Sequence, residues 1–294
     1  MGQHGYVSSE MLPDLRARLG GIIIDRVAGG KAAQHHDRIF RAPGERWFAP
    51  DRPVRLVHAD SSMFIGGLRA LLLQALHPLA MAGVAAHSGY RSDPWGRLQR
   101  TNYFLAVTTY GLAEDAEAAV RRVRAVHQRV TGNAPDGRPY SAADPHLLEW
   151  VHVAEVDSFL TAYQRYGTAP LDAAQRDAYV ADTARVAREL GVVDPPLTYA
   201  QLRVRLAAFR PELRGTPEAR AVARFLLLGP SLPALARPGY AALAAAAISS
   251  MPVWARLPLR LPYLPVTEAT VVRAAGVGVT QLLRWATTAP PRAA

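Results

Sequence analysis

The segment Glu114–Val130, EDAEAAVRRVRAVHQRV, gives the clearest indication of how this chain folds. Apolar residues and one histidine recur in it at spacings of three and four, which places them on one face of an α-helix: Ala116, Val120, Val123, His127 and Val130. Arginines fill most of the remaining positions, and Gly132 follows as a helix-ending residue. We therefore predict an amphipathic helix that packs one face against a core.

Patterns of the same kind continue through the chain from Ser62 onward. Several carry boundary signals: Asp93 and Asp144 each precede a proline in a first helical turn, and Gly191 follows the last turn of another stretch. Only residues 54–57 look extended, and 133–140 look like a Gly/Pro turn. The sequence therefore predicts an all-α fold, with helices over 62–76, 79–86, 94–110, 114–130, 144–166, 172–190, 198–208, 216–228 and 266–288.

Length and composition favour one globular domain. The chain has 294 residues, of which 50% are hydrophobic and 20% charged, so it is able to bury a sizeable core. The sequence shows no internal repeat and no convincing linker that would divide it. We therefore expect a single domain over residues 1–294.

The chain is basic, with a net charge of +10. A basic surface attracts nucleic acid, anionic lipid or acidic ligands, but the arginines are scattered and no nucleic-acid recognition motif accompanies them. Nucleic acid is therefore not an expected partner. The absence of cysteine excludes disulfides, thiolate metal sites and covalent C-x-x-C-H attachment of a cofactor.

The most apolar stretches, residues 64–86 and 226–254, are interrupted by arginine, by a histidine-proline pair or by several prolines. Neither gives the roughly 20 uninterrupted apolar residues that a membrane-spanning helix needs. Residues 1–15 carry charges and no apolar leader segment. We expect a cytoplasmic protein, in which the second stretch is able to make peripheral contact with a membrane surface.

His127 is the first candidate for a functional residue, because it lies on the apolar stripe of the 114–130 helix. One interpretation is a core histidine satisfied by a hydrogen bond. The other is a metal ligand that reaches from a helix into an apolar pocket, since neutral imidazole is a common metal ligand. The helical pattern alone is compatible with both.

A second candidate group follows Pro94 at helical spacing: Arg97, Arg100 and Thr101. Positions i, i+3 and i+4 share one helix face. The group is either a solvated basic face or a cationic patch above a cofactor, with Thr101 as a hydroxyl donor. Arginine keeps its charge when buried and donates in a fixed fork, which suits the binding of carboxylates.

A third candidate pair, His152 and Glu155, occupies adjacent positions on one face of the 144–166 helix. It is an orienting carboxylate–histidine pair, a second cofactor contact or a buried salt link. His77, before Pro78, is interpreted as a helix-end residue whose charged form favours the C-terminal end of the helix dipole. The sequence contains no H-E-x-x-H, P-loop, G-x-S-x-G or dinucleotide-binding motif.

An ordered set of short motifs extends over roughly residues 40–270. It comprises LQALHP at 73–78, GV at 83–84, HS at 87–88, DPWGRLQRT at 93–101, VHQRVTG at 126–132, YSA-x-DP at 140–145 and LEWVH at 148–152. Each motif is weak alone. As an ordered set they resemble the family that contains the MpaB oxygenases and the latex-clearing rubber oxygenases.

The resemblance implies a globin-like helical core, with extra helices at both ends, that holds one b-type haem. Since the chain has no cysteine, this haem is held without a covalent bond and its axial ligand comes from another residue type, which we predict to be histidine. The family's H-x-x-V-x-G segment places the proximal iron ligand at His127. Its R-x-x-[K/R]-T segment places Arg97, Arg100 and Thr101 on the distal side. The helix position of His152 adds a predicted haem contact, either as a partner behind the ligand or as a second axial ligand.

The resemblance also implies an oxygenase that acts with O2 on a small apolar molecule, unsaturated or isoprenoid-like. Two departures point away from rubber itself: Arg100 stands where rubber oxygenases carry lysine, and residues 68–89 contain no carboxylate in place of their distal glutamate. Two other functions stay open at this point. One is a haem-binding gas sensor or store without turnover, and the other is a basic interaction protein without haem.

Overall fold

Helices dominate the computed structural model, which describes residues 35–228 and 232–288 together with 16, 20–21, 25–26 and 29. The only regular strands in these residues are β1 (Thr131–Asn133) and β2 (Pro139–Ser141), which form one antiparallel hairpin. The predicted all-α fold is therefore confirmed. The expectation of a single domain stays a prediction, and residues 1–15, expected to lack a leader segment, lie outside the described residues.

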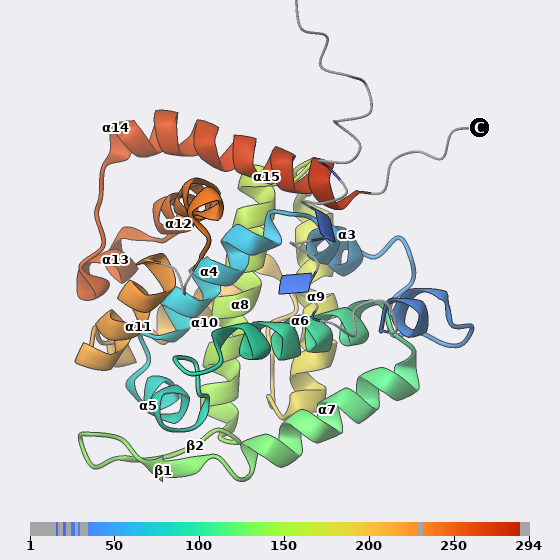
Figure 1. Cartoon of the computed structure of the whole chain (residues 1–294). Coiled ribbons are helices and arrows are strands. Elements are labelled where there is room, and N and C mark those ends of the chain that lie inside the picture. The colour runs from blue at the N-terminus through green and yellow to red at the C-terminus, as the bar shows by residue number, and fades with distance from the viewer. Residues whose placement is uncertain are drawn as a thin grey trace, which may run out of the picture.

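Helix α8 (Pro145–Tyr166) runs through the middle of the molecule (Figure 1). Most of its 22 residues are buried, as expected of a helix that other elements surround. Helix α4 (Met63–Gln74) packs along it. Gly66 allows this close approach, because a Cβ atom at that position would lie 2.9 Å from the ring of Phe159 and 3.1 Å from its Cα atom.

The remaining helical elements surround this pair. In chain order they are η1 (Asp37–Arg41), α3 (Pro53–Ala59), α5 (Pro78–His87), α6 (Pro94–Tyr110), α7 (Ala113–His127), α9 (Ala173–Leu190), α10 (Tyr199–Ala208), η2 (Arg210–Glu212), α11 (Pro217–Leu228), η3 (Ala234–Ala236), α12 (Arg237–Ser250), α13 (Val253–Leu259), α14 (Pro265–Thr267), η4 (Glu268–Val272) and α15 (Arg273–Thr287). Helices α6, α7 and α9 pack beside one another on one side, and α12 joins α4 to α15 on the other (Figure 1).

The predicted helix boundaries are confirmed where a capping residue sets them. Asp93 accepts a hydrogen bond from the backbone N–H of Gly96 at the start of α6, and Asp144 accepts one from the N–H of His146 at the start of α8. Gly191 ends α9 with a φ of 115°, in the left-handed region that favours glycine. These caps fix the register in which α6 and α8 present their side chains.

The prediction of extended structure at residues 54–57 is wrong, because these residues belong to α3. Pro53 occupies the first turn of this helix, a position that favours proline. Val54 and Val57 are both buried, and a spacing of three is the helical one. The stretch is too short for its periodicity to distinguish a strand from a helix.

Helix α7 is shorter than predicted, since it ends at His127. The backbone carbonyl of Val130 accepts the N–H of Ala142 beside the hairpin, so the chain has already left the helix there. The predicted turn at 133–140 is correspondingly flanked by short strands. His127 is therefore the last residue of α7 and not one of its middle residues.

No single helix in the described residues is long and apolar enough to cross a membrane. Two pairs of consecutive helices reach that length and composition when both helices of the pair are counted as one segment. Each pair is sharply bent between its helices: α3 with α4 by 94°, and residues 234–250 with α13 by 119°.

Candidate functional site

His127, the last residue of α7, is half-buried. Its Nδ1 atom is buried and has no hydrogen-bond partner in the described part of the chain. Burial lowers the pKa of its imidazole, so the ring is neutral near pH 7. A neutral ring with an unused nitrogen is able to ligate a metal ion. The interpretation as a core histidine has no hydrogen bond at this atom to support it.

Helix α6 carries the predicted cationic group, but its three side chains have different surroundings. Arg97 is half-buried and donates a hydrogen bond to the Ser88 hydroxyl at 2.9 Å. Burial, and then the charge of Arg100, lowers the pKa of Arg97. Arg100 is exposed and pairs with Asp93 at 3.2 Å, while the exposed Thr101 donates its hydroxyl proton to the carbonyl of Arg97. Only Arg97 of the three is withdrawn from solvent.

His152 and Glu155 lie on α8, where burial favours the uncharged form of each side chain. Burial lowers the pKa of His152 to about 4, and its Nε2 atom is buried without a hydrogen-bond partner among the described residues. Burial also raises the pKa of Glu155 to about 7. No hydrogen bond or ion pair joins the two side chains, so the interpretation as a salt link has no contact to support it.

Sequence patterns missed a buried polar chain that connects three helices beside Glu155. Nδ1 of His58 on α3 lies 2.8 Å from the hydroxyl of Thr109 on α6, and its Nε2 lies 3.4 Å from the hydroxyl of Tyr179 on α9. Burial lowers the pKa of His58 to about 4. Burial and then the charge of Glu155 raise the pKa of Tyr179. His58 directly follows the segment expected to be extended, residues 54–57, and nothing in the sequence marked it as functional.

The structure does not join all the predicted site residues by direct contacts. In the described residues no hydrogen bond or ion pair connects His127 to Arg97, Arg100, Thr101 or His152. A cofactor between them would not require such contacts, so the roles assigned to these residues stay predictions.

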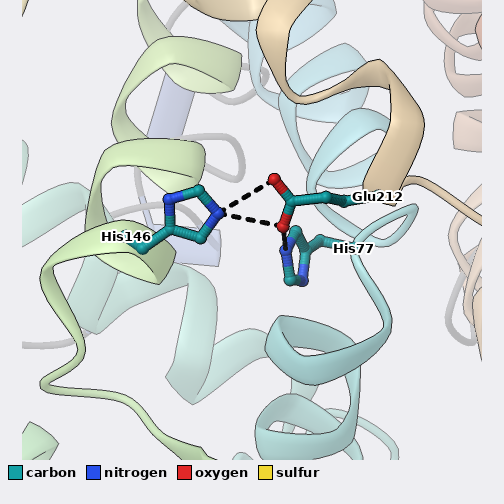
Figure 2. A group of neighbouring side chains, drawn as sticks. All are labelled: His77, His146 and Glu212. Atoms are coloured by element: carbon teal, nitrogen blue, oxygen red, sulfur yellow. Dashed lines mark hydrogen bonds and ion pairs between the residues drawn. The ribbon is translucent and has the colours of Figure 1, made fainter.

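His77 has surroundings unlike those predicted for it. It is almost fully buried and directly precedes α5, and it does not close a helix as an exposed cation. Burial lowers its pKa, and its Nε2 atom lies 3.3 Å from the carboxylate of Glu212. His146 contacts the same carboxylate, so these side chains form a cluster that sequence spacing did not indicate (Figure 2).

Glu155→Gln is expected to remove a pH-dependent loss of stability. The folded-state pKa of about 7 is raised above the ordinary value of 4.5, so the folded protein retains a proton that the unfolded chain releases. The free energy of unfolding therefore falls as pH rises from about 4.5 to about 7, because the buried carboxylate must ionise. At pH 8 the glutamine variant should be more stable than the wild type by roughly 1–3 kcal/mol, and at pH 4 nearly equal to it.

Urea denaturation of both proteins at pH 4 and pH 8 measures this difference. Glu189→Gln, at an exposed position on α9, is the control and should change the free energy of unfolding by less than about 0.5 kcal/mol at either pH. A Glu155→Gln effect of equal size at both pH values would contradict the assignment of a buried, protonated carboxyl group.

The amino-acid sequence matches one known protein family. A family described as "ER-bound oxygenase mpaB/B'/Rubber oxygenase, catalytic domain" matches residues 55–286, a span that contains all the predicted site residues and the cluster of Figure 2. No curated protein and no solved structure matches the chain. The matched span covers well over half of the chain, and the predicted resemblance is confirmed. The chain belongs to the oxygenase family of mpaB and rubber oxygenase catalytic domains.

Proposed function

We propose that this protein is a b-type haem-dependent oxygenase that acts with O2 on a small apolar molecule, unsaturated or isoprenoid-like. The observation that carries the proposal is the buried, unpartnered Nδ1 atom of a neutral His127, in the H-x-x-V-x-G segment of an oxygenase catalytic domain. Membership of the family supports the oxygenase reaction, and the state of this histidine supports a bound metal cofactor.

The residues in place fit a haem held without a covalent bond. Nδ1 of His127 and Nε2 of His152 are buried imidazole nitrogens without a hydrogen-bond partner in the described residues, and burial keeps both rings neutral. Arg97 supplies a half-buried cation of the kind that pairs with a propionate. Because the chain has no cysteine, thiolate ligation is excluded, and the buried, unpartnered imidazole nitrogens are the ligands that we propose.

In this arrangement His127 would hold the iron and His152 would contact the same cofactor from α8. The haem, when bound, supplies the chemistry of oxygen activation. Arg97 keeps a positive charge in a half-buried position, where it is able to orient a propionate or polarise a bound ligand. Glu155, with a pKa of about 7, is able to hold or release a proton near neutral pH.

The absorption spectrum of the purified protein, ferric and dithionite-reduced, together with a pyridine haemochrome assay, tests the proposal. A strong Soret band and about one b-type haem per chain are expected. Consumption of O2 that depends on an added apolar, unsaturated compound then separates an oxygenase from a gas sensor or store. A protein that binds polyanions and shows no Soret band after reconstitution with haem would be the basic interaction protein, and the proposal would be wrong.

Arg100→Ala is expected to leave the haem content unchanged but to change the affinity for a small ligand such as CO by about 3- to 10-fold, the effect of one ordinary hydrogen bond. The side chain of Arg100 is 66% exposed, so its removal should not unfold the protein. Titration of the reduced protein with CO measures the affinity. Arg121→Ala, which removes a 70% exposed arginine on α7, is the control. Equal CO affinity in Arg100→Ala and the wild type would show that Arg100 does not act on the distal side.

A further inference from the structure

Three potential metal ligands from separate segments of the chain meet at one point on the molecule (Figure 2). His77 lies between α4 and α5, His146 in the first turn of α8, and Glu212 at the end of η2. The Nε2 atom of His77 lies 3.3 Å from Oε2 of Glu212, and that of His146 lies 2.9 Å from the same oxygen and 3.0 Å from Oε1. The ligand atoms of all three residues lie within 4.8 Å of one another.

The surrounding fold holds these side chains in place. Pro78 and Pro145 occupy first helical turns, so each histidine lies next to a rigid helix start. The ring of His146 packs against Phe209 with 4.7 Å between ring centroids. Phe209 also accepts the backbone N–H of Glu212 at its carbonyl oxygen, at 2.9 Å. The fold therefore places the two histidines and the backbone of Glu212 beside one another.

The spacing of the donor atoms is close to that around a bound cation. Zinc bonds of about 2.0–2.1 Å in a tetrahedral arrangement separate neighbouring ligand atoms by about 3.3–3.4 Å. The nitrogen-to-oxygen separations of 2.9 and 3.3 Å need only a small opening to accept an ion. Two imidazoles and one carboxylate are the donor set of many zinc and non-haem iron centres that keep open positions.

The electrostatic state of the cluster also suits a cation. Burial lowers the pKa of His77, so its ring is neutral near pH 7. Partial burial opposes ionisation of Glu212, but hydrogen bonds from His146 and His77 outweigh it and lower the pKa of the carboxyl group. Nδ1 of His77 has no hydrogen-bond partner in the described residues, so the ring proton is able to move there and leave the Nε2 lone pair unoccupied. The nearby Arg138 already pairs with Asp136 at 2.7 Å.

We propose that His77, His146 and Glu212 form a binding site for one divalent transition-metal cation of the zinc class. The side chains of His146 and Glu212 are 51% and 42% exposed, so the site opens to solvent and leaves room for water or another ligand on the ion. It shares no residue with the proposed haem site around His127. A bound ion would link the α4–α5 junction, α8 and η2 through one centre.

Titration of the chelator-treated full chain with Zn²⁺ by calorimetry, and with Co²⁺ by its visible absorption, tests the site. We expect about one ion per chain and, at a Zn²⁺ concentration about 100-fold above Kd, a rise in Tm of about 4 °C. His146→Ala and Glu212→Gln should each weaken binding by at least about 100-fold and abolish the rise in Tm, since even outer-shell changes weaken metal sites by 10- to 100-fold. Both altered side chains are partly exposed, so the variants should fold.

Two controls keep this test separate from the haem proposal. His36→Ala removes a histidine whose side chain is 53% exposed, close to the 51% of His146, and should bind Zn²⁺ like the wild type. His127→Ala should also bind Zn²⁺ normally, whatever its haem content. Unchanged Zn²⁺ affinity in Glu212→Gln, or the absence of saturable one-to-one binding in the wild type, would overturn the proposed site. Loss of Zn²⁺ binding in folded His127→Ala would overturn its separation from the haem site.

Discussion

Replacing His127 with alanine is expected to lower the haem content of the purified protein from about one per chain to less than about a tenth. The chain has no cysteine to form a thioether or thiolate bond, so the proposed haem would depend on its imidazole ligand and on burial. In the proposed site the side chain of His127 would supply that ligand from the last turn of α7. Alanine at this position favours the helix and removes only a half-buried ring. The pyridine haemochrome assay and far-UV circular dichroism measure haem content and fold together.

His152→Ala is the matched variant for this experiment, because His152 also has a buried nitrogen without a hydrogen-bond partner in the described residues. It should retain most of its haem if His127 is the ligand that holds the iron. Free imidazole added to His127→Ala should restore haem binding. A variant that lost haem because it was misfolded would not regain it in this way. Normal haem occupancy in folded His127→Ala would contradict the ligand assignment, and loss of haem in His152→Ala alone would transfer the role to α8.

The sequence predicted the helices best where a local signal sets the boundary. The hydrogen bonds of Asp93, Asp144 and Asp172 to their helix starts lie within three residues of the cap, so residue order alone reveals them. The prediction failed at residues 54–57, where four residues are too few for a period, and at the end of α7, where the pairing of β1 with β2 ends the helix. The first failure is a lack of local signal, and the second depends on a contact that forms only in the folded chain.

The candidate site was likewise predicted where residues lie close in sequence and missed where they do not. Helical spacing placed Arg97, Arg100 and Thr101 together on α6, but it could not show that only Arg97 turns away from solvent. The meeting of His77 and Glu212 joins positions 135 residues apart, and no periodicity extends over such a distance. A local pattern also predicts the charge of a side chain from its residue type, and His77 was interpreted as charged. Burial lowers the pKa of His77, so its imidazole is neutral near pH 7.

The interface between the two central helices contains a buried ion pair that no sequence pattern indicated. Arg69 on α4 donates to the carboxylate of Asp157 on α8 at 2.7 Å, and the exposed fractions of their side chains are 2% and 0%. Arg69 also donates to the hydroxyl of Ser158 and to the backbone carbonyl of Ser250. The second oxygen of Asp157 accepts from Arg203, whose side chain is 50% exposed. One carboxylate therefore has a buried arginine partner and a half-exposed one.

Arg69→Met is expected to lower the free energy of unfolding by about 3–5 kcal/mol, because it leaves the carboxylate of Asp157 buried with only one partner. For a chain of this size the corresponding fall in Tm is about 5–8 °C. Arg203→Met removes the half-exposed partner of the same carboxylate and should cost less than about 1 kcal/mol. Urea denaturation of the three proteins compares them directly. Equal losses in the free energy of unfolding of the two variants would mean that burial does not set the strength of the ion pair. A loss below about 1 kcal/mol in Arg69→Met would show that packing alone joins α4 to α8.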